Sequence, residues 1–167
     1  MNPVQQQPAD PNTLLNEIQK IKEGIATLQD LREGRLSVAQ HSLLQSNSPR
    51  EDETARHALN EAQREISSGY VKLKDDMTRI KKTPGSGNVQ TQLEVQTRAI
   101  RKEFEDFQKS QTDYTRRLKE QVRRRVQVSM DQDAPPEEVD RAVDAVLAGH
   151  EQTFQVRLIL CALSGQC

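Results

Sequence analysis

Residues 93–128 read LEVQTRAIRKEFEDFQKSQTDYTRRLKEQVRRRVQV and repeat a 4–3 spacing with no proline or glycine in between. Seven of the eleven spaced positions are apolar, and a seam of this period indicates a helix that buries one stripe against partner helices. The seam positions are Leu93, Thr97, Ile100, Phe104, Phe107, Gln111, Tyr114, Leu118, Gln121, Arg125 and Val128. The same spacing occurs twice more upstream, so the chain supplies its own partners. The sequence therefore predicts an all-α bundle, and a binding module rather than an enzyme.

The upstream stripes place two further long helices. The first, over 12–45, contains Gly24 and Gly34; we expect it to continue through Gly24 and to weaken or bend after Gly34. The second, over 49–82, starts at Ser48 and Pro49, a cap and first-turn pair typical of a helix N-terminus. A loop rich in proline and glycine follows, and the third helix covers 89–130. The prediction is an antiparallel up-down-up three-helix bundle over 12–130.

The ends of the chain lie outside this bundle. Residues 1–11 are rich in proline and glutamine and are predicted to be disordered, with Asn12 or Thr13 capping the first helix. After a break at 131–135, an acidic segment predicts a short helix over about 136–148 within a linker of residues 131–159. Residues 160–167 form a tail.

Composition favours an elongated helical protein. Only 34% of the residues are hydrophobic and 3% aromatic, while 29% are charged, which suits long thin helices better than a layered sheet fold. The net charge of −1 gives no overall case for binding nucleic acid or an anionic membrane. No apolar run approaches a membrane span, and no secretory signal opens the chain. Cys161 and Cys167 both lie near the C-terminus, so we expect free thiols and a cytoplasmic protein.

The residue types that carry chemistry are scattered. His41, His57 and His150 lie on separate segments without the spacing of metal ligands, and no phosphate-binding loop or zinc motif is present. We therefore expect no catalytic residue, no cofactor and no metal.

Two polar features of the third helix allow two interpretations each. The basic residues within 116–125 form either a solvated helix end that complements the dipole or a patch for an acidic protein, phosphoinositide or nucleic acid. The seam residues Gln111, Gln121 and Arg125 either contact a partner or set register within the bundle. In both cases the structural interpretation is preferred. The basic residues are Arg116, Arg117, Lys119, Arg123, Arg124 and Arg125.

Four stretches of the sequence resemble the syntaxin family of SNARE proteins. The most specific stretch is FEDFQKSQTDYTRRLKEQVRRRVQV (104–128), which continues across the break into PPEEVDRAVDAVLAGHEQTF (135–154). Together these resemble the family's third helix, the acidic linker helix, and a glycine followed by a phenylalanine, here Phe154. LLNEIQKIKEGIATLQDL (14–31) resembles the first helix and ISSGYVKLKDDMTRIK (66–81) the end of the second. The resemblance spans about residues 14–159, and the fungal plasma-membrane Sso type is the most similar.

The resemblance implies a regulatory N-terminal domain of the Habc kind in a t-SNARE. Such a domain binds a SNARE-motif helix along its second and third helices and is recognised by SM-family proteins during exocytosis, on the cytosolic face of the plasma membrane. A three-helix bundle offers a long groove for a fourth amphipathic helix. The candidate groove residues, chosen off the buried stripes, are Val71, Arg117, Val122, Arg124 and Val126. We expect a monomer that binds these partners in trans.

The chain also departs from the family pattern. The residues given contain no SNARE motif and no membrane anchor, the tail LCALSGQC (160–167) does not resemble the family, and residues 1–7 lack the Arg-Thr pair of the N-terminal regulator-binding peptide. The alternative function is a dimeric coiled-coil scaffold or a membrane-shaping module of the BAR kind. A spectrin-like spacer repeat is a third possibility, which the absence of tryptophan disfavours.

Overall fold

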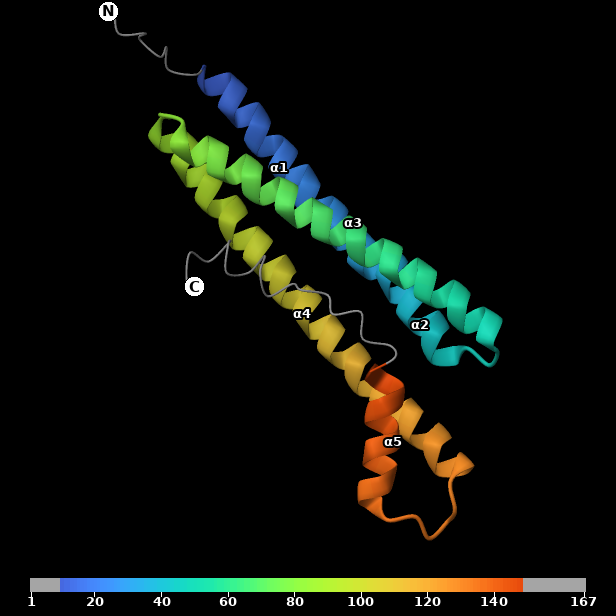
Figure 1. The fold of residues 1–167 in the computed structure, drawn as a ribbon. Coiled ribbons are helices and arrows are strands. Elements are labelled where there is room, and N and C mark those ends of the chain that lie inside the picture. The colour runs from blue at the N-terminus through green and yellow to red at the C-terminus, as the bar shows by residue number, and fades with distance from the viewer. Residues whose placement is uncertain (1–9, 149–167) are drawn as a thin grey trace, which may run out of the picture.

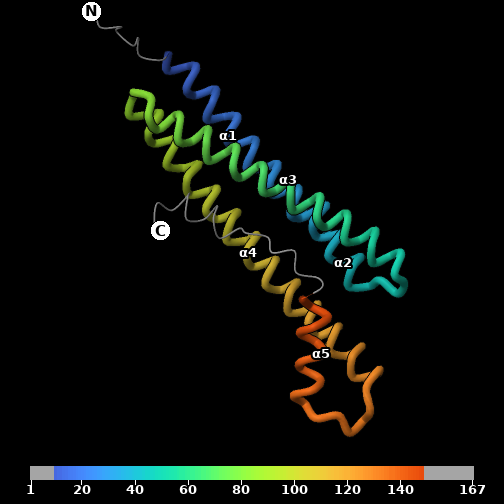
Figure 2. The backbone as a smooth tube through the Cα atoms, in the orientation of Figure 1, coloured from blue at the N-terminus to red at the C-terminus, as the bar shows by residue number. Residues whose placement is uncertain are grey.

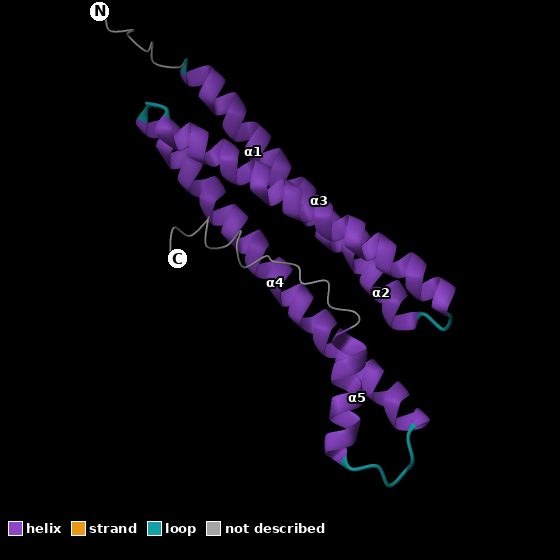
Figure 3. Cartoon of the chain, in the orientation of Figure 1, coloured by secondary structure: helices purple, strands orange, loops and turns teal. Residues whose placement is uncertain are grey.

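A computed structural model of the chain describes residues 10–148, and every regular element in that range is a helix (Figure 1, Figure 3). The expectation of an all-α protein is confirmed for these residues. The elements are α1 (Pro11–Leu31), the π-helical segment η1 (Arg32–Leu36), α2 (Ser37–Gln45), α3 (Pro49–Lys82), α4 (Gly87–Ser129) and α5 (Pro136–Ala148). The predictions for residues 1–9, Phe154, both cysteines and the tail 160–167 lie outside the described residues.

The first helix begins earlier than the sequence suggested. Asp10, not Asn12 or Thr13, is the N-cap, and its carboxylate accepts the backbone N–H of Asn12 at 3.2 Å. Pro11 can therefore occupy the first turn, where a missing N–H costs no helix hydrogen bond. The prediction of Asn12 or Thr13 as the N-cap was wrong, because the Asp10 carboxylate already accepts an early backbone N–H of the helix.

The π-helical segment η1 shifts the phase of the buried stripe. A 4–3 spacing continued from Leu28 would bring Arg35 and Ser42 into the core. Instead Leu36 is fully buried and Leu43 is 4% exposed, each one residue later along the chain. The wider turn of a π-helix absorbs the extra residue. Gly34 lies within this segment and has no atom within 4 Å of where a Cβ would stand, so it marks the irregular turn without serving a close contact.

Two glycines allow α1 and α3 to pack closely. A Cβ on Gly24 would lie 2.7 Å from a methyl group of Leu73, and a Cβ on Gly69 would lie 2.7 Å from a methyl group of Leu28. Each leucine is buried, at 4% and 2% exposure, so each side chain of one helix fills the space left by the glycine of the other. Gly24 therefore has a packing role inside the helix in addition to its cost in helix propensity.

α1, η1, α2, α3 and most of α4 share one hydrophobic cluster, which we call the main core. Its centre is aromatic: the ring of Tyr70 meets Phe104 edge-on at 5.4 Å between centroids and Phe107 at 6.2 Å. Contacts join α1 to both α3 and α4, and α2 to α3, whereas the backbones of α3 and α4 come close at few positions. The large rings fill the space between these two helices.

α4 continues past the turn between α2 and α3, and α5 folds back against this extension (Figure 2). Val122, Val126, Val139 and Val143 form a second buried cluster, which we call the α4–α5 core. Leu118 packs against both cores. The apolar seam positions of α4 are buried through Tyr114, and Leu118 is half-buried. Val128, at the end of the seam, is 88% exposed because the helices that cover the seam have already ended.

Candidate functional site

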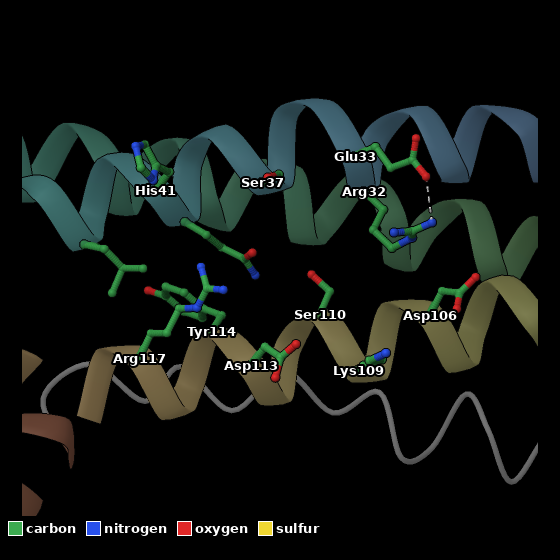
Figure 4. A pocket seen from close by; sticks show the side chains of 12 residues that line it. Arg32, Glu33, Ser37, His41, Asp106, Lys109, Ser110, Asp113, Tyr114 and Arg117 are labelled. Carbon is green, nitrogen blue, oxygen red and sulfur yellow. Dashed lines mark hydrogen bonds and ion pairs between the residues drawn. The ribbon is translucent and has the colours of Figure 1, made fainter. Parts of the chain in front are cut away.

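A polar cleft of about 520 Å³ separates η1 and α2 from the middle of α4. Figure 4 shows Arg32, Glu33 and His41 on one wall and Lys109 and Arg117 on the other. Its lining is mostly polar and carries both signs of charge, so the cleft suits a peptide or helix surface better than an apolar small molecule.

A buried ion pair closes one end of this cleft. Arg32 Nε donates to Glu103 Oε1 at 2.7 Å and Arg32 Nη2 donates to Glu103 Oε2 at 3.2 Å, which is the bidentate geometry of arginine with a carboxylate. Only 7% of the Glu103 side chain and 16% of the Arg32 side chain are exposed. The hydrogen bond from the guanidinium to Glu103 raises the pKa of Arg32. The pair links the start of η1 to α4, so it can specify how the two segments align.

A second pair lies on the rim of the cleft. Lys102 Nζ contacts Asp106 Oδ2 at 2.9 Å, one helical turn apart. This hydrogen bond lowers the pKa of the Asp106 carboxyl and raises the pKa of Lys102. Both groups are exposed, so the pair adds little to stability and mainly sets the charge pattern of the rim.

The five predicted groove residues do not come together. Val71 is 47% exposed on α3, as a docking position requires, but Val122 and Val126 are only 5% and 8% exposed. The expectation that these two valines line an open groove was wrong, because α5 folds over them and uses them as the α4–α5 core. The sequence did contain a signal for this packing. The short acidic helix has an apolar face, and such a face must pack against apolar residues of another helix.

The two predicted arginines lie on a different flank of α4. Arg117 lines the polar cleft opposite η1 and α2, and Arg124, two turns later, projects from the same face of the helix. Arg124 Nε donates to the carbonyl of Glu120 at 3.4 Å. Both side chains are exposed and available to an acidic group of a partner.

The polar seam residues have internal partners. Gln40 donates to the side-chain oxygen of Gln111 at 3.1 Å, Gln121 donates to the backbone carbonyl of Leu44, and Arg125 Nη2 donates to the carbonyl of Ser46 at 2.5 Å. Carbonyls at a helix C-terminus lack partners within the helix, and α4 supplies them for α2. These contacts favour the interpretation that the polar seam positions set register.

The basic residues near the end of α4 do not form one patch. Arg116 pairs with Glu120 at 3.0 Å, Arg123 pairs with Asp140 of α5, and Arg125 is bound to the turn between α2 and α3. The segment facing this end of α4 is acidic, with Asp131, Asp133, Glu137, Glu138, Asp140 and Asp144. Part of the basic cluster therefore has its acidic partner in the same chain, an arrangement the sequence analysis did not anticipate.

Within residues 10–148 no group of histidine, cysteine and carboxylate side chains has the arrangement of a metal site. No helix in this range has the length and apolar character needed to cross a bilayer. No protein-family model matches the chain, and no curated protein matches it.

Proposed function

We propose that this chain is the regulatory N-terminal domain of a syntaxin-like t-SNARE. The proposed architecture is an antiparallel up-down-up three-helix bundle of the Habc kind, followed by a linker helix. Its proposed role is to bind a SNARE-motif helix, an SM-family protein, or both, and so to control vesicle fusion in exocytosis. The parent protein would lie on the cytosolic face of the plasma membrane, and the domain would act as a monomer without a cofactor.

The observation that carries the proposal is the joining of α4 to α5. This is the stretch where the resemblance to syntaxins is most specific, since a long heptad helix with a basic end passes through a break into an acidic helix. Long heptad helices alone occur in many proteins, but the acidic helix folded against the basic end is a more particular arrangement. Three long helical segments that share the main core are consistent with it.

The partner helix would lie along the outside of α3 and α4, whose backbones are held apart by the rings of Tyr70, Phe104 and Phe107. Their backbones approach each other at fewer positions than α1 approaches either of them. A partner helix laid along this side would cover Val71, which is the exposed apolar residue of α3. Because α5 already covers Val122 and Val126, the partner would bind the part of α4 that precedes these valines, together with the middle of α3.

Light scattering coupled to size exclusion tests the proposal, with and without a syntaxin-type SNARE-motif peptide. We expect a monomer of 19.0 kDa that takes up one peptide. The variant Val71→Asp should weaken uptake at least tenfold. Val38→Asp is the matched control, because Val38 is also exposed, at 65%, but lies on α2 away from the proposed surface.

Two results would contradict the proposal. If the chain bound no peptide at high micromolar concentration, the proposal that it binds a partner helix would be wrong. A stable dimer that ignores the peptide would instead support the coiled-coil scaffold, since a scaffold of the BAR kind needs a dimer interface.

A further inference from the structure

The turn between α2 and α3 presents a serine directly before a proline. Ser48 is the N-cap of α3 and has extended backbone angles, φ −139° and ψ 152°, and Pro49 occupies the first helical position. The Ser48 hydroxyl oxygen accepts the backbone N–H of Glu51 at 3.2 Å. The residue is partly exposed and follows the exposed Asn47. A serine directly before a proline is the sequence that a proline-directed kinase recognises, and here the serine itself lies in extended backbone just before the helix.

The same turn is held against the basic end of α4. Arg125 donates to the Ser46 carbonyl at 2.5 Å, and Gln121 donates to the Leu44 carbonyl. The Cα atoms of Ser46 and Ser48 are two residues apart and so are separated by at most about 7 Å. The guanidinium of Arg125 is therefore bound at this turn, at the carbonyl two residues before Ser48, and Arg50 follows on the first turn of α3.

We propose that Ser48 is a phosphorylation site for a proline-directed serine/threonine kinase, and that Arg125 and the N-terminal amides of α3 hold the phosphate. The Ser48 Oγ attacks the γ-phosphorus of ATP, the bond from that phosphorus to the bridging oxygen of the β-phosphate breaks, and ADP leaves. The hydroxyl proton passes to a base of the kinase. The modified residue ties the turn between α2 and α3 to α4. This inference does not depend on the proposed SNARE function.

The charges around Ser48 favour a phosphate despite two nearby carboxylates. The Glu51 carboxylate accepts the backbone N–H of Asn47 at 2.8 Å, and the Asp52 carboxylate accepts from the Ser46 hydroxyl and pairs with Arg56 at 3.4 Å. Both acids thus have donors of their own. The phosphate meets the positive end of the α3 dipole and the guanidinium of Arg125, which stabilise a dianion at this position.

A second threonine–proline step provides an internal comparison. Thr83 precedes Pro84 at the opposite end of α3, and its hydroxyl donates to the Arg79 carbonyl at 2.9 Å. A phosphate on Thr83 would lose this donor and would meet the negative end of the dipole. Phosphorylation should therefore stabilise the protein at Ser48 and destabilise it at Thr83.

The site borders the junction of the two cores. A cleft of about 250 Å³ between α2, the first turn of α3, α4 and α5 is lined by Asp52, Arg125 and Val146, among others. A phosphate that draws Arg125 more firmly to the turn would hold this junction together. Modification at Ser48 would then affect how firmly α5 stays in place.

The first experiment treats the full chain with a purified proline-directed kinase and ATP and maps the phosphate by mass spectrometry. We expect a phosphate at Ser48 that is lost in Ser48→Ala and retained in Thr83→Ala. A free peptide of residues 42–54 serves as the positive control for kinase activity. A chain that stays unmodified at Ser48 while the peptide is modified would overturn the proposal.

The second experiment measures the thermal midpoint before and after modification. Phosphorylation at Ser48 should raise the midpoint by about 3 °C, the shift expected for roughly 1 kcal/mol in a chain of this size. In Arg125→Gln, which keeps a donor to the turn, the rise should fall by at least half. An unchanged or lower thermal midpoint in the parent chain would contradict stabilisation of the start of α3 by the phosphate. An undiminished rise in Arg125→Gln would show that Arg125 does not bind the phosphate.

Discussion

The main core and the α4–α5 core hold helices of the same chain in different ways. The main core joins segments far apart in sequence, contains the edge-on and tilted rings of Tyr70, Phe104 and Phe107, and includes the buried Arg32–Glu103 pair. The α4–α5 core joins neighbouring segments through four valines and one exposed ion pair. A 13-residue helix is too short to be stable alone, so α5 depends on this small contact.

The difference teaches where the molecule can change without unfolding. Opening the main core exposes aromatic rings and an ion pair together, so it requires global unfolding. Release of α5 exposes only the small α4–α5 core and leaves the main core intact, which is local opening of the kind that costs less than global unfolding. Substitutions in the main core and in the α4–α5 core should separate these two behaviours.

Phe104→Ala should destabilise the whole protein. Phe104 is 1% exposed and contacts both other rings, so truncation removes a large buried side chain and leaves a cavity. We expect a loss of about 3–5 kcal/mol in the free energy of unfolding, measured by urea denaturation followed by circular dichroism. An effect below about 1 kcal/mol would mean that the aromatic rings are not the centre of the main core.

Glu103→Gln should cost about 2–3 kcal/mol, because it removes the buried carboxylate and leaves the guanidinium of Arg32 with the exposed Glu33, at 3.1 Å, as its carboxylate partner. The partial exposure of Arg32 places the expected loss at or below the lower end of the range for fully buried pairs. The double variant Arg32→Met/Glu103→Leu should recover most of the loss. If Arg32→Met/Glu103→Leu were as unstable as Glu103→Gln, the ion pair would stabilise the fold in addition to setting how η1 and α4 align.

Val143→Ala should act locally. Val143 is 1% exposed in the α4–α5 core, and removing its two methyl groups should weaken the docking of α5 by about 2 kcal/mol. Hydrogen exchange should accelerate in α5, while the urea midpoint of the main transition stays nearly unchanged. A shift of the main transition as large as that of Phe104→Ala would show that the two cores unfold as one unit.

Tyr114 should make the main core sensitive to alkaline pH. Burial raises the pKa of Tyr114 to about 12, against about 10 in an unfolded chain. Between pH 10 and 12 the unfolded chain loses this proton and the folded chain keeps it, so the free energy of unfolding falls as the pH rises. Tyr114→Phe should reduce this fall and be nearly neutral at pH 7, because the hydroxyl has no partner among residues 10–148. An unchanged alkaline profile in the variant would contradict this account.

Gly34→Ala should have the smallest effect, a gain of about 0.5–1 kcal/mol from reduced freedom of the unfolded chain. The space around Gly34 is open, whereas a Cβ on Gly69 would meet the buried Leu28. Gly69→Ala is therefore the matched control and should gain less or lose stability. Equal gains from both variants, measured by thermal unfolding, would show that the glycine contacts between α1 and α3 are not tight.

The sequence predicted the helices well where local pattern decides the outcome. The seam positions from Leu93 to Tyr114 indicated the buried face of α4, and Ser48 with Pro49 indicated the start of α3. The seam failed at Val128 because burial there depends on which helices still lie alongside, and α2 and α3 end before that point. Periodicity describes one helix and carries no information about the length of its neighbours.

The candidate site was harder to predict because its residues meet across the fold. Arg32 and Glu103 are 71 positions apart, and Glu103 lies beside the seam rather than on it. Arg32 lies at the position that the 4–3 spacing reaches next after Leu28, but the spacing does not indicate which side chain of α4 it meets. The sequence pattern places Val122 and Val126 off the seam of α4, so they were predicted to be open groove positions. They are covered because the apolar face of α5 packs on them. An apolar stripe on the short acidic helix was the available signal.

Hydrogen exchange at neutral pH, resolved by peptide along the chain, tests the central claim most directly. The account predicts that amides of α5 exchange through local opening while those of α3 and the middle of α4 exchange only with global unfolding. Val143→Ala should increase exchange in α5 alone. Equal protection in α5 and α3, with Val143→Ala accelerating both, would contradict the division into two cores.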